Sequence, residues 1–285
     1  MLIPKIHWNV QTRCNLPCGF CYLWRVPGAV PMDTRVARQL ISEAATISEW
    51  FVFGGGDPLM RADIVDLIRH AHDAGLRIDL QTNAVLFRGD TAASLLRLVN
   101  RVGLSLDGED ELTHGQMRGS AQNFRQVLDA LRLCDINRVP VTIRTLVTPL
   151  NRGRLAGIWT LLADYSCVEK WSLRQFAALG RGERTRSKYS MSRSEFLHVS
   201  ATIRTHVGNG ATIPVSVVTV DDMENCFCLV SEDGAIYGHP TDAHYRSCGR
   251  FPEDSLAAAV DKLKYDHLKR TARNQRRLHQ LPALA

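Results

Sequence analysis

Short apolar runs alternate with longer amphipathic segments along the first two thirds of the chain. The short runs are rich in β-branched and aromatic residues, which favours buried strands, and six are expected, over residues 5–12, 50–53, 77–82, 101–106, 140–147 and 168–176. The longer segments carry apolar residues at helical spacing and cover residues 34–47, 62–74, 90–100, 121–134 and 154–165. This alternation predicts an α/β fold of βα units around a parallel sheet.

The pattern changes after residue 176. Residues 177–190 are rich in Gly, Arg and Ser and predict a loop, which a helix at 193–206 and a strand at 212–219 follow. Asp233-Gly234 stands between two alternating runs, as is typical of a β-hairpin turn. The last forty residues are expected to be helical and polar. We therefore expect a main unit over residues 1–190 and a smaller extension over residues 191–285.

Length and composition fit one enzyme core with an appendage. The 285 residues are 45% hydrophobic and 22% charged, which excludes collagen, coiled-coil rods and wholesale disorder. No apolar stretch reaches the roughly 18 to 20 residues that span a bilayer, and the N-terminus lacks the layout of a signal peptide. We expect a soluble, cytoplasmic protein without a membrane partner.

The net charge of +6 is placed unevenly. From residue 261 onward, seven Lys and Arg stand against two Asp, so this segment carries +5 and the rest of the chain only +1. A basic terminal helix can bind nucleic acid, but a solvated helix face is the commoner explanation. Nucleic acid is therefore not an expected partner.

Six of the eight cysteines fall in two groups, and in a reduced compartment grouped thiols more often bind metal than form disulfides. Cys14, Cys18 and Cys21 follow the first predicted strand, where Pro17 and Gly19 disfavour a regular helix. Three soft ligands at this spacing suit an iron–sulfur cluster with one iron left open. A structural zinc site needs a fourth ligand, and none lies nearby.

This motif, C-x3-C-x2-C after the first strand of a βα series, resembles the radical S-adenosylmethionine (SAM) superfamily. Three later segments strengthen the resemblance, each at the end of a predicted strand: Gly54-Gly55-Gly56-Asp57-Pro58, Thr82-Asn83, and Ser105-Leu106-Asp107-Gly108 with Arg118-Gly119 beyond it. They are similar to the family's GGEP, TNG and SLDG…RG segments. The likeness covers about residues 5–180, with Asp57 in place of the usual Glu.

The resemblance implies a partial (β/α)6 TIM-like barrel, extended by a small C-terminal β-hairpin and helix. It implies a [4Fe-4S] cluster on Cys14, Cys18 and Cys21, a SAM molecule on the open iron, and an electron donor such as flavodoxin or ferredoxin. The residues expected to bind SAM are Tyr22, Gly55, Gly56, Asp57, Thr82, Asn83, Ser105, Asp107 and Arg144. A 5′-deoxyadenosyl radical would then take a hydrogen atom from the substrate.

The second group of cysteines is Cys226 and Cys228, with Cys248 twenty residues further on. Their segment resembles the auxiliary-cluster extension, called twitch, of some radical SAM enzymes, although His239 stands where that hairpin carries a cysteine. We expect an auxiliary iron–sulfur cluster on Cys226 and Cys228, completed by His239, Cys248 or Cys167. As a lone thiol, Cys167 is more typical of the core, and Cys134 is expected to be structural.

Cys248 also has an alternative role. A thiol can return a hydrogen atom to a substrate radical from the opposite face and so invert the carbon, and radical SAM epimerases of sugars and peptides, including the neomycin epimerase type, resemble this layout. We therefore favour epimerisation of a small-molecule or peptide natural product, with Cys248 as the catalytic donor. Dehydrogenation through an auxiliary cluster is nearly as well supported. A non-catalytic iron–sulfur or zinc regulator that binds nucleic acid is the alternative of another class.

A few other polar residues leave two interpretations open. Asp79, Glu109, Asp110 and Glu111 could face a cationic substrate such as an amino sugar, or could lie in a solvated loop. Arg144 and Arg174 lie on the fifth and sixth predicted strands, where inward-facing polar groups meet cofactor or substrate. His7 on the first strand could reach the site, although ordinary packing is more common.

Overall fold

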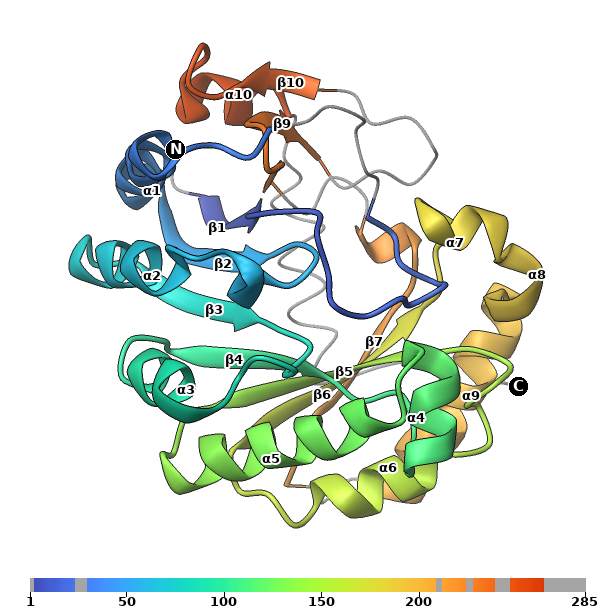
Figure 1. Cartoon of the computed structure of the whole chain (residues 1–285). Coiled ribbons are helices and arrows are strands. Elements are labelled where there is room, and N and C mark those ends of the chain that lie inside the picture. Colours follow the sequence, from blue (N-terminus) through green and yellow to red (C-terminus); the bar gives the residue numbers. More distant parts are fainter. Residues whose placement is uncertain (1–2, 24–29, 209–211, 224–227, 239–246, 264–285) are drawn as a thin grey trace.

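One continuous sheet runs through the protein, as the computed structural model shows for the residues it describes, 3–23, 30–208, 212–223, 228–238 and 247–263 (Figure 1). Six parallel strands form its centre and follow one another in chain order. They are β1 (Ile3–Asn9), β2 (Ser48–Gly54), β3 (Arg77–Gln81), β4 (Arg101–Ser105), β5 (Val141–Val147) and β6 (Val168–Gln175). The predicted α/β fold, a partial (β/α)6 barrel, is confirmed.

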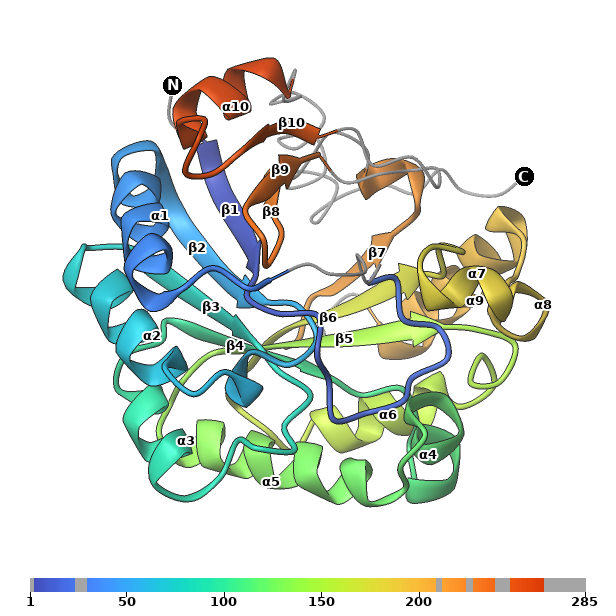
Figure 2. The same ribbon diagram turned by 45° about the horizontal axis from the view of Figure 1, so that its top comes forward.

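Helices cover the outer face of this curved sheet (Figure 2). They are α1 (Thr34–Ile47), α2 (Ile64–Asp73), α3 (Gly89–Leu96), α5 (Gln122–Ile136), α6 (Leu155–Leu162) and α9 (Arg193–Val207). Their apolar stripes explain the packing: α1 buries Ala37, Leu40, Ile41 and Ala44 at helical spacing, and Asp33 caps its first turn through the Val36 N–H. The core therefore lies between the helices and the sheet.

The segments beyond residue 190 extend both edges of the sheet. After α9, β7 (Val215–Val218) pairs parallel with β6, and the 3-10 helix η2 (Asp221–Met223) follows. On the opposite edge, β8 (Cys228–Val230) pairs parallel with β1, and β9 (Ala235–Tyr237) and β10 (Ser247–Arg250) continue antiparallel before α10 (Leu256–Lys262). The expected hairpin turn is present, with Gly234 at a φ of 87°. The division at residue 190 stays a prediction.

Two local expectations, for residues 177–190 and for the last forty residues, were wrong, and the acidic stretch after β4 is not simply a solvated loop. Residues 177–190 are not a plain loop, because they contain the short helices α7 (Arg181–Arg184) and α8 (Arg186–Tyr189). The acidic stretch after β4 begins a helix, α4 (Glu111–Arg118), in which Asp110 caps the Thr113 N–H. The last forty residues are not helical throughout, because they include β10. A short 3-10 helix, η1 (Pro58–Met60), also follows β2.

In the part of the chain that the structure describes, no helix is long and apolar enough to cross a membrane.

Candidate active site

A cavity of about 270 Å³ opens at the carboxyl ends of the central strands. Polar and glycine residues from five strand ends line it: Gly55 and Gly56 after β2, Thr82 and Asn83 after β3, Ser105 on β4, Arg144 on β5 and Arg174 on β6. Tyr22, 41% exposed, and His7 on β1 also line it. In barrels of this kind, ligands bind at this end of the strands.

The three clustered cysteines lie on the cluster loop, which we define as residues 12–23, and all three line the cavity. Cys18 is 7% exposed, and the Cys21 N–H donates to its carbonyl oxygen at 3.4 Å. Burial raises the pKa of the Cys18 and Cys21 thiols, and the nearby Cys14 raises it further in both. A metal that binds these thiols must displace their protons, so binding is coupled to proton release.

The donor set fits a cubane cluster. Among the described residues, no three His, Cys, Asp or Glu side chains converge closely enough to hold a single metal ion. In a [4Fe-4S] cluster, each thiolate ligates a different iron, so three cysteines that line one cavity without converging on a single point suit it. Cys14, Cys18 and Cys21 are thus the residues that would hold such a cluster, and the mononuclear zinc alternative is disfavoured.

Gly55 and Gly56 let the segment after β2 lie directly against the start of the cluster loop. The Gly56 N–H donates to the Gln11 carbonyl at 2.8 Å, and the Asp57 N–H donates to the Arg13 carbonyl at 3.0 Å. A Cβ on Gly56 would stand 1.9 Å from the Arg13 oxygen, and one on Gly55 would stand 2.5 Å from the Gln11 oxygen. Only glycine permits this approach.

Asp57 is fully buried and does not line the cavity. One carboxylate oxygen accepts the Leu59 N–H at 3.0 Å, and the other accepts the Thr82 hydroxyl and the Asn83 N–H, both at 2.8 Å. Burial raises the pKa of this carboxyl. The side chain therefore ties the loop after β2 to the loop after β3, while Gly55 and Gly56 present backbone to the cavity.

Asn83 contacts a cluster cysteine directly. Its side-chain nitrogen lies 3.4 Å from the Cys14 sulfur and donates to the Asn15 side-chain oxygen at 2.6 Å. An N–H group directed at a thiolate stabilises the charged sulfur and tunes the metal that it binds. Asn83 can therefore position Cys14 as well as line the cavity.

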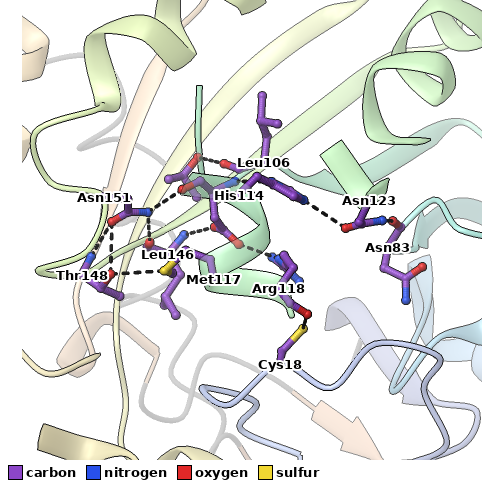
Figure 3. Close-up of polar contacts among 12 residues, drawn as sticks. Cys18, Asn83, Leu106, His114, Met117, Arg118, Asn123, Leu146, Thr148 and Asn151 are labelled. Atoms are coloured by element: carbon purple, nitrogen blue, oxygen red, sulfur yellow. Dashed lines mark hydrogen bonds and ion pairs between the residues drawn. The ribbon is translucent and has the colours of Figure 1, made fainter. Parts of the chain in front are cut away.

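Asp107 supports the cluster loop through Arg118, which lies beside Cys18 in Figure 3. It is fully buried, and it accepts the Leu146 N–H at 2.8 Å and the Arg118 Nε–H at 2.6 Å. The Cys18 thiol in turn donates to the Arg118 carbonyl at 3.5 Å. Like Asp57, Asp107 does not line the cavity. Its contacts are those of a positioning residue.

The sequence analysis missed His114, which lies on α4 between the two parts of the SLDG…RG segment, and Asn123, which lies beyond it on α5. The Asp107 N–H donates to His114 Nδ1 at 3.2 Å, so Nδ1 is unprotonated and Nε2 carries the hydrogen that points to the Asn123 oxygen 3.0 Å away. Burial lowers the pKa of His114, which keeps the ring neutral. Asn123 then donates to the Asn83 carbonyl at 2.8 Å (Figure 3).

The segment containing α7 and α8 holds the other end of the cluster loop. The Gly182 N–H donates to the Cys21 carbonyl at 3.2 Å, and the Thr185 hydroxyl donates to the Gly19 carbonyl at 2.8 Å. Phe20 packs edge to face on Tyr189 with ring centroids 5.6 Å apart. These contacts explain why a Gly-rich, polar stretch is ordered here: it is folded against the cluster loop.

The hairpin between β8 and β9 reaches the same loop through Glu232. Its carboxylate accepts the Thr12 N–H at 2.6 Å and the Thr12 hydroxyl at 2.7 Å, and the residue is 6% exposed. Thr12 lies two residues before Cys14. The C-terminal hairpin therefore fixes the entry to the cluster loop, a contact that sequence spacing does not reveal.

Asp79 turns into the barrel, where three cations surround it. Its Oδ2 lies 2.6 Å from Arg101, 3.3 Å from Lys5 and 3.7 Å from Arg144. Arg144 extends from this group to the cavity and passes over β4, where a Cβ on Gly103 would stand 1.8 Å from its guanidinium. Arg144 thus reaches the cavity, and its role in SAM binding stays a prediction.

The other acidic candidates have structural partners. Asp110 caps α4, while Glu109 pairs with Arg154 at 2.8 Å and Glu111 with Arg125. None of these acids, nor Asp79, lines the cavity. The interpretation that they face a cationic substrate is therefore not supported by their positions.

Of the second group of cysteines, Cys228 and Cys248 are described, whereas Cys226 and His239 lie outside the described residues. Cys228 on β8 is fully buried, and burial raises the pKa of its thiol to about 12, with Cys248 adding to the effect. Cys248 on β10 is partly exposed, packs against the core and does not line the cavity. Cys134 and Cys167 are buried in the core between α5 and β6, as expected.

A partial barrel with three cavity-lining thiols beside glycine and polar strand ends defines a cofactor-dependent iron–sulfur site. The chain matches the model of the Radical SAM superfamily over residues 8–158, more than half its length. It therefore belongs to the radical SAM superfamily, whose members use a [4Fe-4S] cluster and SAM.

Individual relatives are more distant. The chain is 28% identical over 224 residues to the Fe-coproporphyrin III synthase of Methanosarcina barkeri, covering 77% of this chain and 56% of that protein. It is 30% identical over 180 residues to the PqqA peptide cyclase of Rhodopseudomonas palustris, covering 59% and 48%. The chain thus spans about half the length of these two relatives.

SuiB of Streptococcus suis, solved with its precursor peptide SuiA, superposes with a TM-score of 0.73 at 13% identity, over 95% of this chain and 66% of that chain. This likeness shows the fold.

Proposed function

We propose that the chain is a radical SAM enzyme that abstracts a hydrogen atom from a natural-product substrate, either a small molecule or a peptide. The observation that carries this proposal is the gathering of Cys14, Cys18 and Cys21 with the ends of β2 to β5 around one cavity. A bound cluster and SAM supply the chemistry: one electron splits the sulfonium and yields the 5′-deoxyadenosyl radical.

The chain's own residues would bind and orient SAM and exclude water from the cavity. Backbone groups of Gly55 and Gly56, with Thr82, Ser105 and Arg144, are proposed to hold SAM, because they line the cavity beside the thiols. Asp57 and Asp107 are proposed to act indirectly, since their carboxylates are occupied within the protein. Tyr22 follows the third cysteine and is placed to contact the adenine.

The fate of the substrate radical separates two candidate reactions. Epimerisation needs Cys248 as a hydrogen donor at the cavity, whereas dehydrogenation needs an auxiliary cluster that accepts an electron. The position of Cys248 beside Cys228, away from the cavity-lining residues, supports a ligand role and hence the oxidative reaction. Relatives that act on a peptide, such as the PqqA peptide cyclase, support a peptide substrate. Epimerisation remains the second candidate.

The test of the main proposal is SAM cleavage by anaerobically reconstituted, chemically reduced protein. We expect 5′-deoxyadenosine from the wild type and none from Cys14→Ala, Cys18→Ala or Cys21→Ala, each with a matching loss of iron. Wild type that carries the cluster yet cleaves no SAM would reject the proposal. Strong, salt-dependent binding to DNA or RNA in its place would favour the non-catalytic regulator.

The two reactions are distinguished by running the reaction in deuterated water. Solvent deuterium at the product carbon, lost in Cys248→Ala, supports epimerisation. A product lighter by two hydrogens, together with a Cys248→Ala protein that has lost part of its iron by Mössbauer spectroscopy, supports an auxiliary cluster and dehydrogenation.

A further inference from the structure

The ionic side chains around the cavity have one sign. Among the described residues that line it, Arg118, Arg144, Arg174 and Arg181 are cationic, and no Asp or Glu is present. Two acids that do not line the cavity lie close to two of these arginines: Asp107 pairs with Arg118 at 2.6 Å, and Asp79 lies 3.7 Å from Arg144. The wall therefore presents a positive potential to any ligand that enters.

Two of these arginines, Arg174 and Arg181, are not among the proposed SAM residues. Gly55, Thr82 and Ser105 belong to the ends of β2, β3 and β4, whereas Arg174 is near the end of β6 and Arg181 begins α7. In the sheet order only β5, which carries Arg144, lies between β4 and β6. The guanidinium groups of Arg174 and Arg181 therefore line the β6 end of the cavity, next to the proposed SAM residues.

The arginine side is built on ordered structure. Arg174 lies on a strand paired on both edges, with β5 and β7. Arg181 is held where Gly180 passes the cluster loop, since a Cβ on Gly180 would stand 2.5 Å from the Tyr22 carbonyl. Gly182, next to Arg181, donates to the Cys21 carbonyl at 3.2 Å. The backbone positions of both arginines are therefore fixed beside the cavity.

We propose that the substrate carries an anionic group, a carboxylate or a phosphate, which Arg174 and Arg181 bind on the β6 side of the cavity. Guanidinium groups bind both anions through paired N–H donors and repel ammonium groups. This inference rests on the proposed function, since it leaves the cavity-lining residues of β2 to β5 to SAM. It argues against a cationic amino sugar, because the acids expected to meet such a substrate do not line the cavity.

The test uses small probes with the reconstituted protein saturated with SAM. Calorimetric titrations with glutarate, inorganic phosphate and glucosamine compare a carboxylate, a phosphate and a cation. We expect one of the anions to bind and glucosamine not to bind, and the tighter anion identifies the substrate's group. Arg174→Gln and Arg181→Gln should each weaken anion binding about tenfold or more. Arg184→Gln, on the same helix α7 but outside the cavity lining, is the matched control and should leave it unchanged.

SAM binding and cleavage are measured on the same samples, so failure of the two proposals is distinguishable. If the wild type binds the anion but cleaves no SAM, the anion site is supported and the proposed radical SAM activity is rejected. The anion proposal is overturned if neither anion binds, if glucosamine binds more tightly, or if both variants bind the anion like the wild type. It is also overturned if both variants lose SAM affinity and keep anion affinity. Because Arg181 is exposed, Arg181→Gln should fold, and it tests the site by itself if Arg174→Gln fails to fold.

Discussion

Asn83 directs its side-chain nitrogen at the Cys14 sulfur, 3.4 Å away. Its backbone carbonyl begins a path of hydrogen bonds that ends at Cys18, a second cluster cysteine. Each residue of this path donates to or accepts from the next, and the path crosses the ends of β3, β4, α4 and α5. Its members, in order, are Cys14, Asn83, Asn123, His114, Asp107, Arg118 and Cys18. Two cluster ligands are thus positioned by one connected network.

Asn83→Asp should weaken the cluster site, because it replaces the N–H donor beside Cys14 with a carboxylate of nearly the same shape. We expect iron affinity to fall about 10- to 100-fold and the cluster potential to become more negative. Iron content and a redox titration followed by electron paramagnetic resonance measure both. Asn137→Asp, at an exposed helix end, is the control, and equal iron loss in the two variants would contradict the role given to Asn83.

Asp107→Asn should destabilise the fold strongly, because it leaves the Arg118 guanidinium without its buried counter-charge. Breaking a buried ion pair costs about 3 to 5 kcal/mol, and urea unfolding of the apo protein measures it. Arg125→Gln breaks the exposed pair with Glu111 and should cost less than about 1 kcal/mol. Similar losses in both variants would show that Asp107 does not anchor Arg118.

Gly56→Ala should prevent the cluster loop from packing against the segment after β2, since its Cβ would overlap the Arg13 carbonyl. We expect loss of most iron after reconstitution, while the helical circular dichroism signal is largely kept. A Cβ on Gly153 meets nothing within 4 Å, so Gly153→Ala is the control and should load iron normally. Full loading of Gly56→Ala would mean that this close approach is dispensable.

The parts of the molecule set by local pattern were predicted well. The helix predicted at 34–47 has those bounds because apolar spacing and the Asp33 cap act within one segment. The cysteines and glycines of the site were found because their spacing itself carries chemistry. In contrast, Glu232 meets Thr12 across 220 residues, and no local property of either residue indicates that contact.

Two aspartates illustrate the same limit inside the motifs. Asp57 and Asp107 stand in segments that resemble cofactor-binding motifs, yet their carboxylates turn into the protein and hold neighbouring loops. A motif identifies the loop but not the direction of each side chain, which depends on the donors that the fold brings near. Residues 177–190 were expected to be a loop for a related reason: their helices are stabilised by packing on the cluster loop.

Asp79→Asn should destabilise the protein at neutral pH by about 3 to 5 kcal/mol, because Lys5, Arg101 and Arg144 lose their buried counter-charge. Burial by itself raises the pKa of Asp79, but these three cations outweigh it and hold the pKa well below its ordinary value. The stabilisation is therefore fully present above the unfolded pKa of about 3.9 and is lost as the pH falls below it.

The measurement is the difference in unfolding free energy between wild type and Asp79→Asn as a function of pH. It should stay constant from about pH 8 to pH 5 and shrink below about pH 4. Asp73→Asn, at an exposed position beside His72, should change stability little at any of these values. A difference that grows on acidification would contradict the depressed pKa.

Alkylation separates the two roles proposed for Cys248. In apo protein at mild pH, iodoacetamide should modify the partly exposed Cys248 quickly and the fully buried Cys228 only after urea is added, as mass spectrometry of peptides can show. If Cys248 is an auxiliary ligand, reconstitution with iron and sulfide should protect it, because a metal-bound thiolate is withdrawn from reaction. Cys167, which is buried in the core, should react slowly in both states and serves as the internal control. A Cys248 that reacts equally fast before and after reconstitution would remove it from the ligand set and favour its role as the hydrogen donor of an epimerase.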